Sequence, residues 1–189
     1  MDSGVDDMSV RDEISEAYVS NALIPRQQVM HWIERGDLRE WGLLYALTRD
    51  AHGRIVPPLD LATTGSFLLR YYLRCIIENP QPADDVHSRF EAAWELTRWL
   101  DHLWGLRPAS DNVIELLIER VTASYLEGDA EIRNVIETGF LEHALERADF
   151  VPLFEQWRHD PRLARAYQDC LAWGLAHRRT DPGANGEEI

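Results

Sequence analysis

The chain has 189 residues, with 33 Asp or Glu against 19 Lys or Arg, so its formal net charge is −14 when the histidines are neutral. Every basic residue is an arginine, and adjacent arginines occur only at Arg178 and Arg179, which argues against binding to nucleic acid or to an anionic membrane. A hydrophobic fraction of 45% excludes a disordered chain, and the length suits one domain or at most two.

Helical periodicity dominates the chain, and no run of alternating apolar and polar residues predicts a strand. The helices that we expect, in chain order, span residues 10–23, 25–36, 38–51, 61–79, 85–104, 111–127, 129–147, 152–157 and 161–177. Asp37, Asp60 and Asp129 are the expected N-caps of three of them. The longest internal connection, 51–59, is the one place where a short extended segment, 54–56, is expected.

These elements predict an all-α fold: a single domain over residues 10–179, built as a multi-helix antiparallel array or irregular bundle, with disordered ends at 1–9 and 180–189. The expected fourth and fifth helices are apolar around most of their circumference, so we place them in the central layer. The predicted members of one shared core are Phe67, Tyr71, Phe90, Trp94, Ile136 and Phe140.

The cellular compartment is inferred from the N-terminal residues and from the two cysteine thiols. The first residues lack the positive and apolar segments of a secretory signal, and Cys75 and Cys170 lie in apolar helical patterns typical of buried, reduced thiols. The most apolar stretch, residues 67–77, is too short and too charged to span a bilayer. We therefore expect a cytoplasmic protein.

No pattern of catalytic, metal-binding or phosphate-binding residues occurs at the required spacing, so neither a cofactor nor a metal is expected. His143 shares a helix side with Ile136 and Phe140, and a hydrogen-bonded, half-buried histidine is the favoured interpretation. Gly139 falls inside the expected helix 129–147, where glycine is unfavourable, so we expect another helix to approach closely there.

The acidic residues suggest partner-binding faces. Glu91 and Glu95 lie on one helix strip, while Glu131, Glu142 and Glu146 share a face of another helix. Such faces are complementary to a basic protein partner and would accelerate association with it. The alternative anchors are two aromatic side chains near the C-terminus, Trp157 and Trp173, although core packing is the favoured interpretation of both.

One segment resembles a known group. Residues 125–145, which read YLEGDAEIRNVIETGFLEHAL, are similar to a pattern found in small helical bacterial proteins, some of them immunity proteins of polymorphic toxins. The matching residues are Gly128, Asp129, Ile132, Arg133, Asn134, Ile136, Thr138, Gly139, Phe140, Leu141 and Glu142. The run 89–94 resembles a second element of that group, and the two cover about a quarter of the chain. The resemblance implies a partner toxin and no catalytic residue.

Three functions therefore remain open at this stage. The first is an immunity or antitoxin protein that binds and neutralises a toxin, and the second is a helical scaffold or adaptor without a toxin partner. The third is an enzyme whose site is assembled from dispersed residues such as Glu91, Glu95, Arg98 and His102. An enzyme would need a pocket with strongly shifted ionisations, so the two binding functions are favoured.

Overall fold

The computed structural model describes residues 8–79 and 86–178, and it confirms the all-α fold. Its N-terminal elements are α1 (Val10–Val19), β1 (Ile24–Pro25), α2 (Arg26–Arg35), α3 (Leu38–Asp50), the 3₁₀ turn η1 (His52–Arg54) and β2 (Ile55–Val56). The central helices are α4 (Leu61–Glu78), α5 (Arg89–Gly105) and α6 (Asp111–Glu127). The C-terminal elements are α7 (Ala130–Val135), the π-helical turn η3 (Ile136–Leu141), α8 (Glu142–Leu145), the 3₁₀ segment η4 (Ala148–Phe154), α9 (Glu155–His159) and α10 (Ala164–His177).

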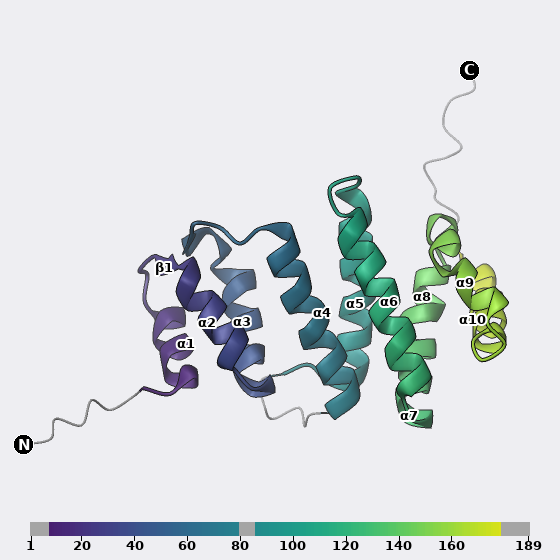
Figure 1. Ribbon diagram of the computed structural model, residues 1–189, viewed down its shortest axis with the longest axis horizontal. Coiled ribbons are helices and arrows are strands. Elements are labelled where there is room, and N and C mark those ends of the chain that lie inside the picture. The colour runs from purple at the N-terminus through teal and green to yellow at the C-terminus, as the bar shows by residue number, and fades with distance from the viewer. Residues whose placement is uncertain (1–7, 80–85, 179–189) are drawn as a thin grey trace, which may run out of the picture.

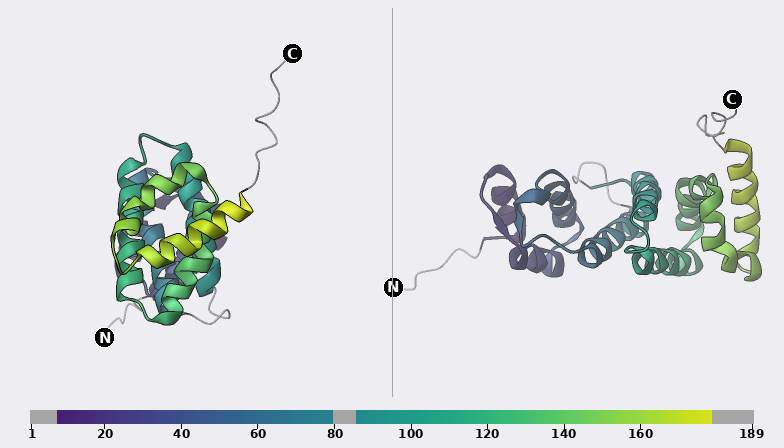
Figure 2. Two further views of the ribbon diagram at one scale, coloured as in Figure 1. Left: turned by 90° about the vertical axis from the view of Figure 1, so that its right-hand side faces the viewer. Right: turned by 90° about the horizontal axis from the view of Figure 1, so that it is seen from above.

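The helices form an elongated array that follows the order of the chain, from α1 at one end to α10 at the other (Figure 1). Seen from above, successive helices again follow one another along the long axis (Figure 2). β1 and β2 pair in parallel over two residues each, which confirms the extended segment expected within 54–56. The expected ends 1–9 and 180–189 lie outside the described residues, apart from Met8 and Ser9, and Ser9 caps α1.

Local chemistry explains where several helices begin and end. The side chains of Asp37, Asp60 and Asp129 each accept a backbone N–H of the first turn, as predicted. Helix α1 ends at Val19, four residues earlier than expected, and the Arg54 guanidinium donates to the carbonyls of Ala17 and Ala22 just there. An arginine far along the chain therefore satisfies the end of the first helix.

Helix α5 begins at Arg89, later than the expected start at 85, because Ser88 and Glu91 form a capping box. In that box the Ser88 hydroxyl accepts the Glu91 N–H, and the Glu91 carboxylate accepts the Ser88 N–H at 2.8 Å. Asp85 itself lies outside the described residues.

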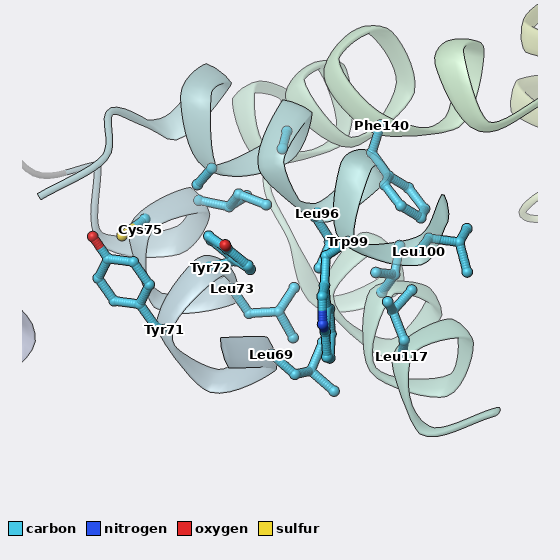
Figure 3. Packing of buried hydrophobic residues seen from close by; sticks show 14 of the residues in the cluster. Leu69, Tyr71, Tyr72, Leu73, Cys75, Leu96, Trp99, Leu100, Leu117 and Phe140 are labelled. Carbon is cyan, nitrogen blue, oxygen red and sulfur yellow. The ribbon is translucent and has the colours of Figure 1, made fainter. Parts of the chain in front are cut away.

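Buried apolar side chains of α4, α5 and α6 meet at the centre, where Leu69, Trp99 and Leu117 lie together with Phe140 of η3 (Figure 3). Four of the six predicted core residues are buried, namely Phe67, Tyr71, Ile136 and Phe140. The other two were wrongly assigned, since Phe90 is 40% exposed and Trp94 is 47% exposed.

The exposure of these two aromatic side chains follows from the crossing of α5 by η3. The crossing is centred on Ala93, the small residue between them: a Cβ built on Gly139 would lie 2.8 Å from the Ala93 Cβ. The expected close approach at Gly139 is therefore confirmed. Because the two backbones meet at Ala93, the larger neighbours Phe90 and Trp94 lie beside the crossing, at the surface.

Candidate protein-binding surface

The outward side of α5 carries Phe90 and Trp94, which lie one helical turn apart on the same face. A monomeric protein usually buries large aromatic rings, and aromatic rings that remain exposed within a polar rim are typical of interaction sites. We call the side chains of Phe90 and Trp94, together with the two hollows beside them, the α5 surface.

The first hollow lies between the start of α5 and helix α7, and it measures about 460 Å³. Phe90 and Arg89 line it from α5, and Glu131 and Asn134 line it from α7. The Arg89 side chain is only 11% exposed, and it donates to the Glu131 carboxylate at 2.8 Å and to the Ile77 carbonyl at 3.3 Å. The arginine therefore links α4, α5 and α7 at the first hollow.

The second hollow, of about 410 Å³, is lined by Trp94, Thr97, Arg98 and His143. His143 approaches from α8, and its Nδ1 lies 2.8 Å from the Glu146 carboxylate. The side chain is 36% exposed, which confirms the expected hydrogen-bonded, half-buried histidine. The walls of the second hollow therefore combine an aromatic ring, a hydroxyl, a guanidinium and an imidazole.

The π-helical turn η3 places α7 and α8 against α5. The Phe140 carbonyl accepts a hydrogen bond from the Thr97 hydroxyl of α5 at 3.4 Å, and the Glu137 carbonyl lies 3.8 Å from the Cys170 thiol of α10. Neighbouring helices thus contribute donors to the carbonyls of the turn. Single π-turns within α-helices are frequent at functional sites, and this one adjoins the exposed aromatic pair.

Three of the five predicted glutamates, those at the start of α5 and on α7, each have a partner within the chain. Glu91 accepts the Ser88 N–H, which lowers the pKa of its carboxyl below the ordinary value. Glu95 pairs with Arg98 at 2.6 Å, and Glu131 pairs with Arg89 while remaining 77% exposed. The acidic character is therefore partly neutralised locally, and Glu131 presents the most accessible of these carboxylates.

The expected face shared by Glu131, Glu142 and Glu146 is interrupted. A π-helical turn inserts one extra residue, so the residues beyond it are rotated by about 100° relative to an uninterrupted α-helix. Glu142 is partly buried, and this burial raises the pKa of its carboxyl. Glu146 accepts from His143 at the second hollow, so only Glu131 and Glu146 of these three border the α5 surface.

The two alternative aromatic anchors also have contacts within the chain. Trp157 is fully buried, and its Nε1 donates to the Thr122 hydroxyl at 2.8 Å, so the favoured core packing is confirmed and the exposed anchor is excluded. Trp173 is half-buried and stacks on His177 with ring centroids 4.0 Å apart. The aromatic pair on α5 was missed as a site because its helical spacing equally fits a core stripe.

The described residues also indicate which chemistry the side chains can support. Burial raises the pKa of the Cys75 thiol to about 12, so this thiol is protonated and a poor nucleophile at neutral pH.

Of the dispersed enzyme candidates, Glu95 and Arg98 meet as an ion pair, and His102 is exposed on the same helix. Within 8–79 and 86–178, no three His, Cys, Asp or Glu side chains are grouped so that they could hold a metal ion.

No helix in the described part of the chain is both long and apolar enough to span a membrane. Comparison with known proteins found no matching family model and no significant similarity to a curated protein or to a solved structure.

Proposed function

We propose that this chain is a protein-binding module and that its partner docks on the α5 surface. The observation that carries the proposal is the pair Phe90 and Trp94, 40% and 47% exposed, between two hollows with polar walls. Binding energy in protein interfaces concentrates in aromatic side chains that fill pockets of the partner, surrounded by a polar rim. The α5 surface has this composition.

The charge of the chain indicates the kind of partner. A net charge of −14 attracts a basic protein at long range, and the exposed Glu131 carboxylate lies beside Phe90. This long-range attraction, called electrostatic steering, raises the association rate. The effect weakens as salt is added, because the Debye length falls from roughly 30 Å at 0.01 M to about 10 Å at 0.1 M. The aromatic pair then governs how slowly the complex dissociates.

Within this class we propose an immunity or antitoxin protein as the particular function. The support is the resemblance of residues 125–145 to immunity-type proteins, together with the position of that segment, whose Asn134 lines the first hollow and whose His143 lines the second. An acidic protein is complementary to a toxin that acts on a polyanion, since such a toxin presents a basic surface. The second candidate is an adaptor that uses the same surface on a partner without toxicity.

The test uses three immobilised proteins in parallel: the wild-type chain, the double variant F90A/W94A and the control L175A. Leu175 is a 51% exposed apolar residue on α10 that lines neither hollow, so its variant loses exposed apolar area on another helix. The proposal expects a protein that the wild type and L175A both retain from extracts of the organism that encodes the chain, and that F90A/W94A loses. With that protein purified, the double variant should weaken binding by about 30-fold or more.

Two results would contradict the docking site: equal binding by all three proteins, or loss with L175A alone. Expression of the captured partner in a bacterial host then separates the two binding functions. A toxin arrests growth, and co-expression of the wild-type chain but not of F90A/W94A restores it. A partner without effect on growth favours the adaptor.

A further inference from the structure

A second surface feature, distinct from the two hollows of the α5 surface, brings three arginines together in a chain with a net charge of −14. A cleft of about 520 Å³ lies between α2 and α3 on one side and α6 on the other, with α4 between them. Three arginines line it, Arg70 and Arg74 from α4 and Arg120 from α6. In Figure 1 these helices occupy neighbouring positions in the left and central parts of the array.

Two of the guanidinium groups in the cleft lie against the ring of Trp41. Arg70 and Arg74 each lie 4.7 Å from the ring centroid, in the position of a cation–π contact. Arg74 also pairs with Glu78 at 2.6 Å, whereas Arg70 and Arg120 have no carboxylate partner within the described part of the chain. A guanidinium that stacks on an aromatic ring keeps its N–H edge available for an anion.

The indole nitrogen of Trp41 provides a second, independent observation. Trp41 is 2% exposed, and its buried Nε1 has no acceptor among the described residues. In contrast, the buried Trp32 and Trp157 donate to Glu13 and Thr122. A Cβ at Gly36, another residue of the cleft wall, would lie 3.1 Å from the Trp41 Nε1, so this nitrogen lies next to a residue that lines the cleft.

We propose that this cleft binds a small molecule that carries one phosphate group. Arg70 and Arg120 would pair with the phosphate oxygens, and the Trp41 Nε1–H would donate to one of them, which would give this buried donor its missing acceptor. Leu73 and Ile77 supply an apolar wall for an organic part of the ligand. This inference is independent of the partner on α5.

The carboxylates at the cleft favour a single phosphate over a polyanion. Glu34 and Glu127 also line the cleft, so the positive charge is confined to its three arginines. An extended nucleic acid would meet these carboxylates and the acidic remainder of the surface, and the chain offers no continuous basic track for it. A compact anion fits against the arginines alone and so avoids repulsion by the two carboxylates of the cleft and by the acidic remainder of the surface.

The test follows the indole N–H resonances by ¹H–¹⁵N NMR at constant ionic strength, with inorganic phosphate in one titration and phenyl phosphate in another. We expect a saturable shift of the assigned Trp41 indole signal. Tighter binding of phenyl phosphate would identify an organic phosphate as the ligand class, and equal binding would identify free phosphate. The variant R70Q/R120Q should raise the Kd at least about tenfold.

The matched control is R158Q/R165Q, which removes the same charge from exposed arginines of α9 and α10. It should change the Kd by less than about twofold, because screening limits the effect of distant charges. The proposal is overturned if the Trp41 signal does not move, if the shift never saturates, or if the two double variants weaken binding equally.

Discussion

Substitution of Gly139 tests the close approach of η3 to α5. A Cβ at this position would lie 2.8 Å from the Ala93 Cβ, whereas carbon atoms in contact prefer about 3.5–4.0 Å, so one backbone must move by about 1 Å. Ala93 offers no flexible side chain that could turn away. We therefore expect Gly139→Leu to incur an overpacking cost near the upper end of the usual range of about 1–3 kcal/mol.

A gain in helix propensity of about 1 kcal/mol opposes this cost, so the net loss in the free energy of unfolding is about 2 kcal/mol. For a chain of this size the loss corresponds to a decrease in Tm of roughly 4–8 °C. Urea denaturation gives the free energy, and a thermal scan gives Tm. Gly105→Leu is the matched control, because a Cβ at Gly105 in the last turn of α5 meets nothing within 4 Å.

A double-mutant cycle locates the clash. Gly139→Ala and Ala93→Gly should each destabilise the protein, but the double variant should be more stable than the sum of the two effects predicts, with a coupling of about 0.5–3 kcal/mol. A rise in Tm for Gly139→Leu comparable to that of the Gly105 control would refute the reasoning, since it would mean that α5 leaves room at this point.

Further predictions follow from burial and capping. Phe140→Ala should lower the free energy of unfolding by about 3–5 kcal/mol and Trp94→Ala by less than about 1 kcal/mol; comparable losses in urea denaturation would contradict the exposure of Trp94. Ser88→Ala removes the α5 cap and should cost about 1 kcal/mol, with faster hydrogen exchange in the first turn of α5; unchanged exchange there would contradict the cap. His87 is partly buried, which lowers its pKa below 6.5, so the unfolded chain binds the proton more readily and stability falls as the pH drops below 6.5. The variant His87→Phe should reduce this dependence of stability on pH, measured by urea denaturation at several pH values. An unaltered slope of the free energy of unfolding against pH would contradict this role of His87.

The features that could be predicted from the sequence are those set by neighbours in the chain. Asp37 and Asp60 were identified as caps because a cap bonds to a backbone group three residues away. Gly139 was informative because glycine is unfavourable inside a helix, and close packing against another segment is the usual reason for it. The capping box of Ser88 and Glu91 carried the same kind of signal, and it was overlooked.

The features that could not be predicted depend on contacts between distant segments. Whether Phe90 faces the core is decided by η3, which crosses α5 almost fifty residues further along the chain. The partner of Glu131 is Arg89, 42 residues away, so the sequence pattern identified an acidic face but not its neutralisation. The π-turn depends in the same way on donors from α5 and α10.

The linear order of the helices has a consequence for how the protein folds and opens. The main contacts join elements that are adjacent in sequence or separated by a few intervening elements, so they span short to moderate lengths of chain and folding should be fast. Stability in such an array is carried from neighbour to neighbour, and the terminal helices have a neighbour on one side only. Helices α1 and α10 should therefore exchange their amide hydrogens through local opening, while α4 and α5 exchange only when the whole chain unfolds.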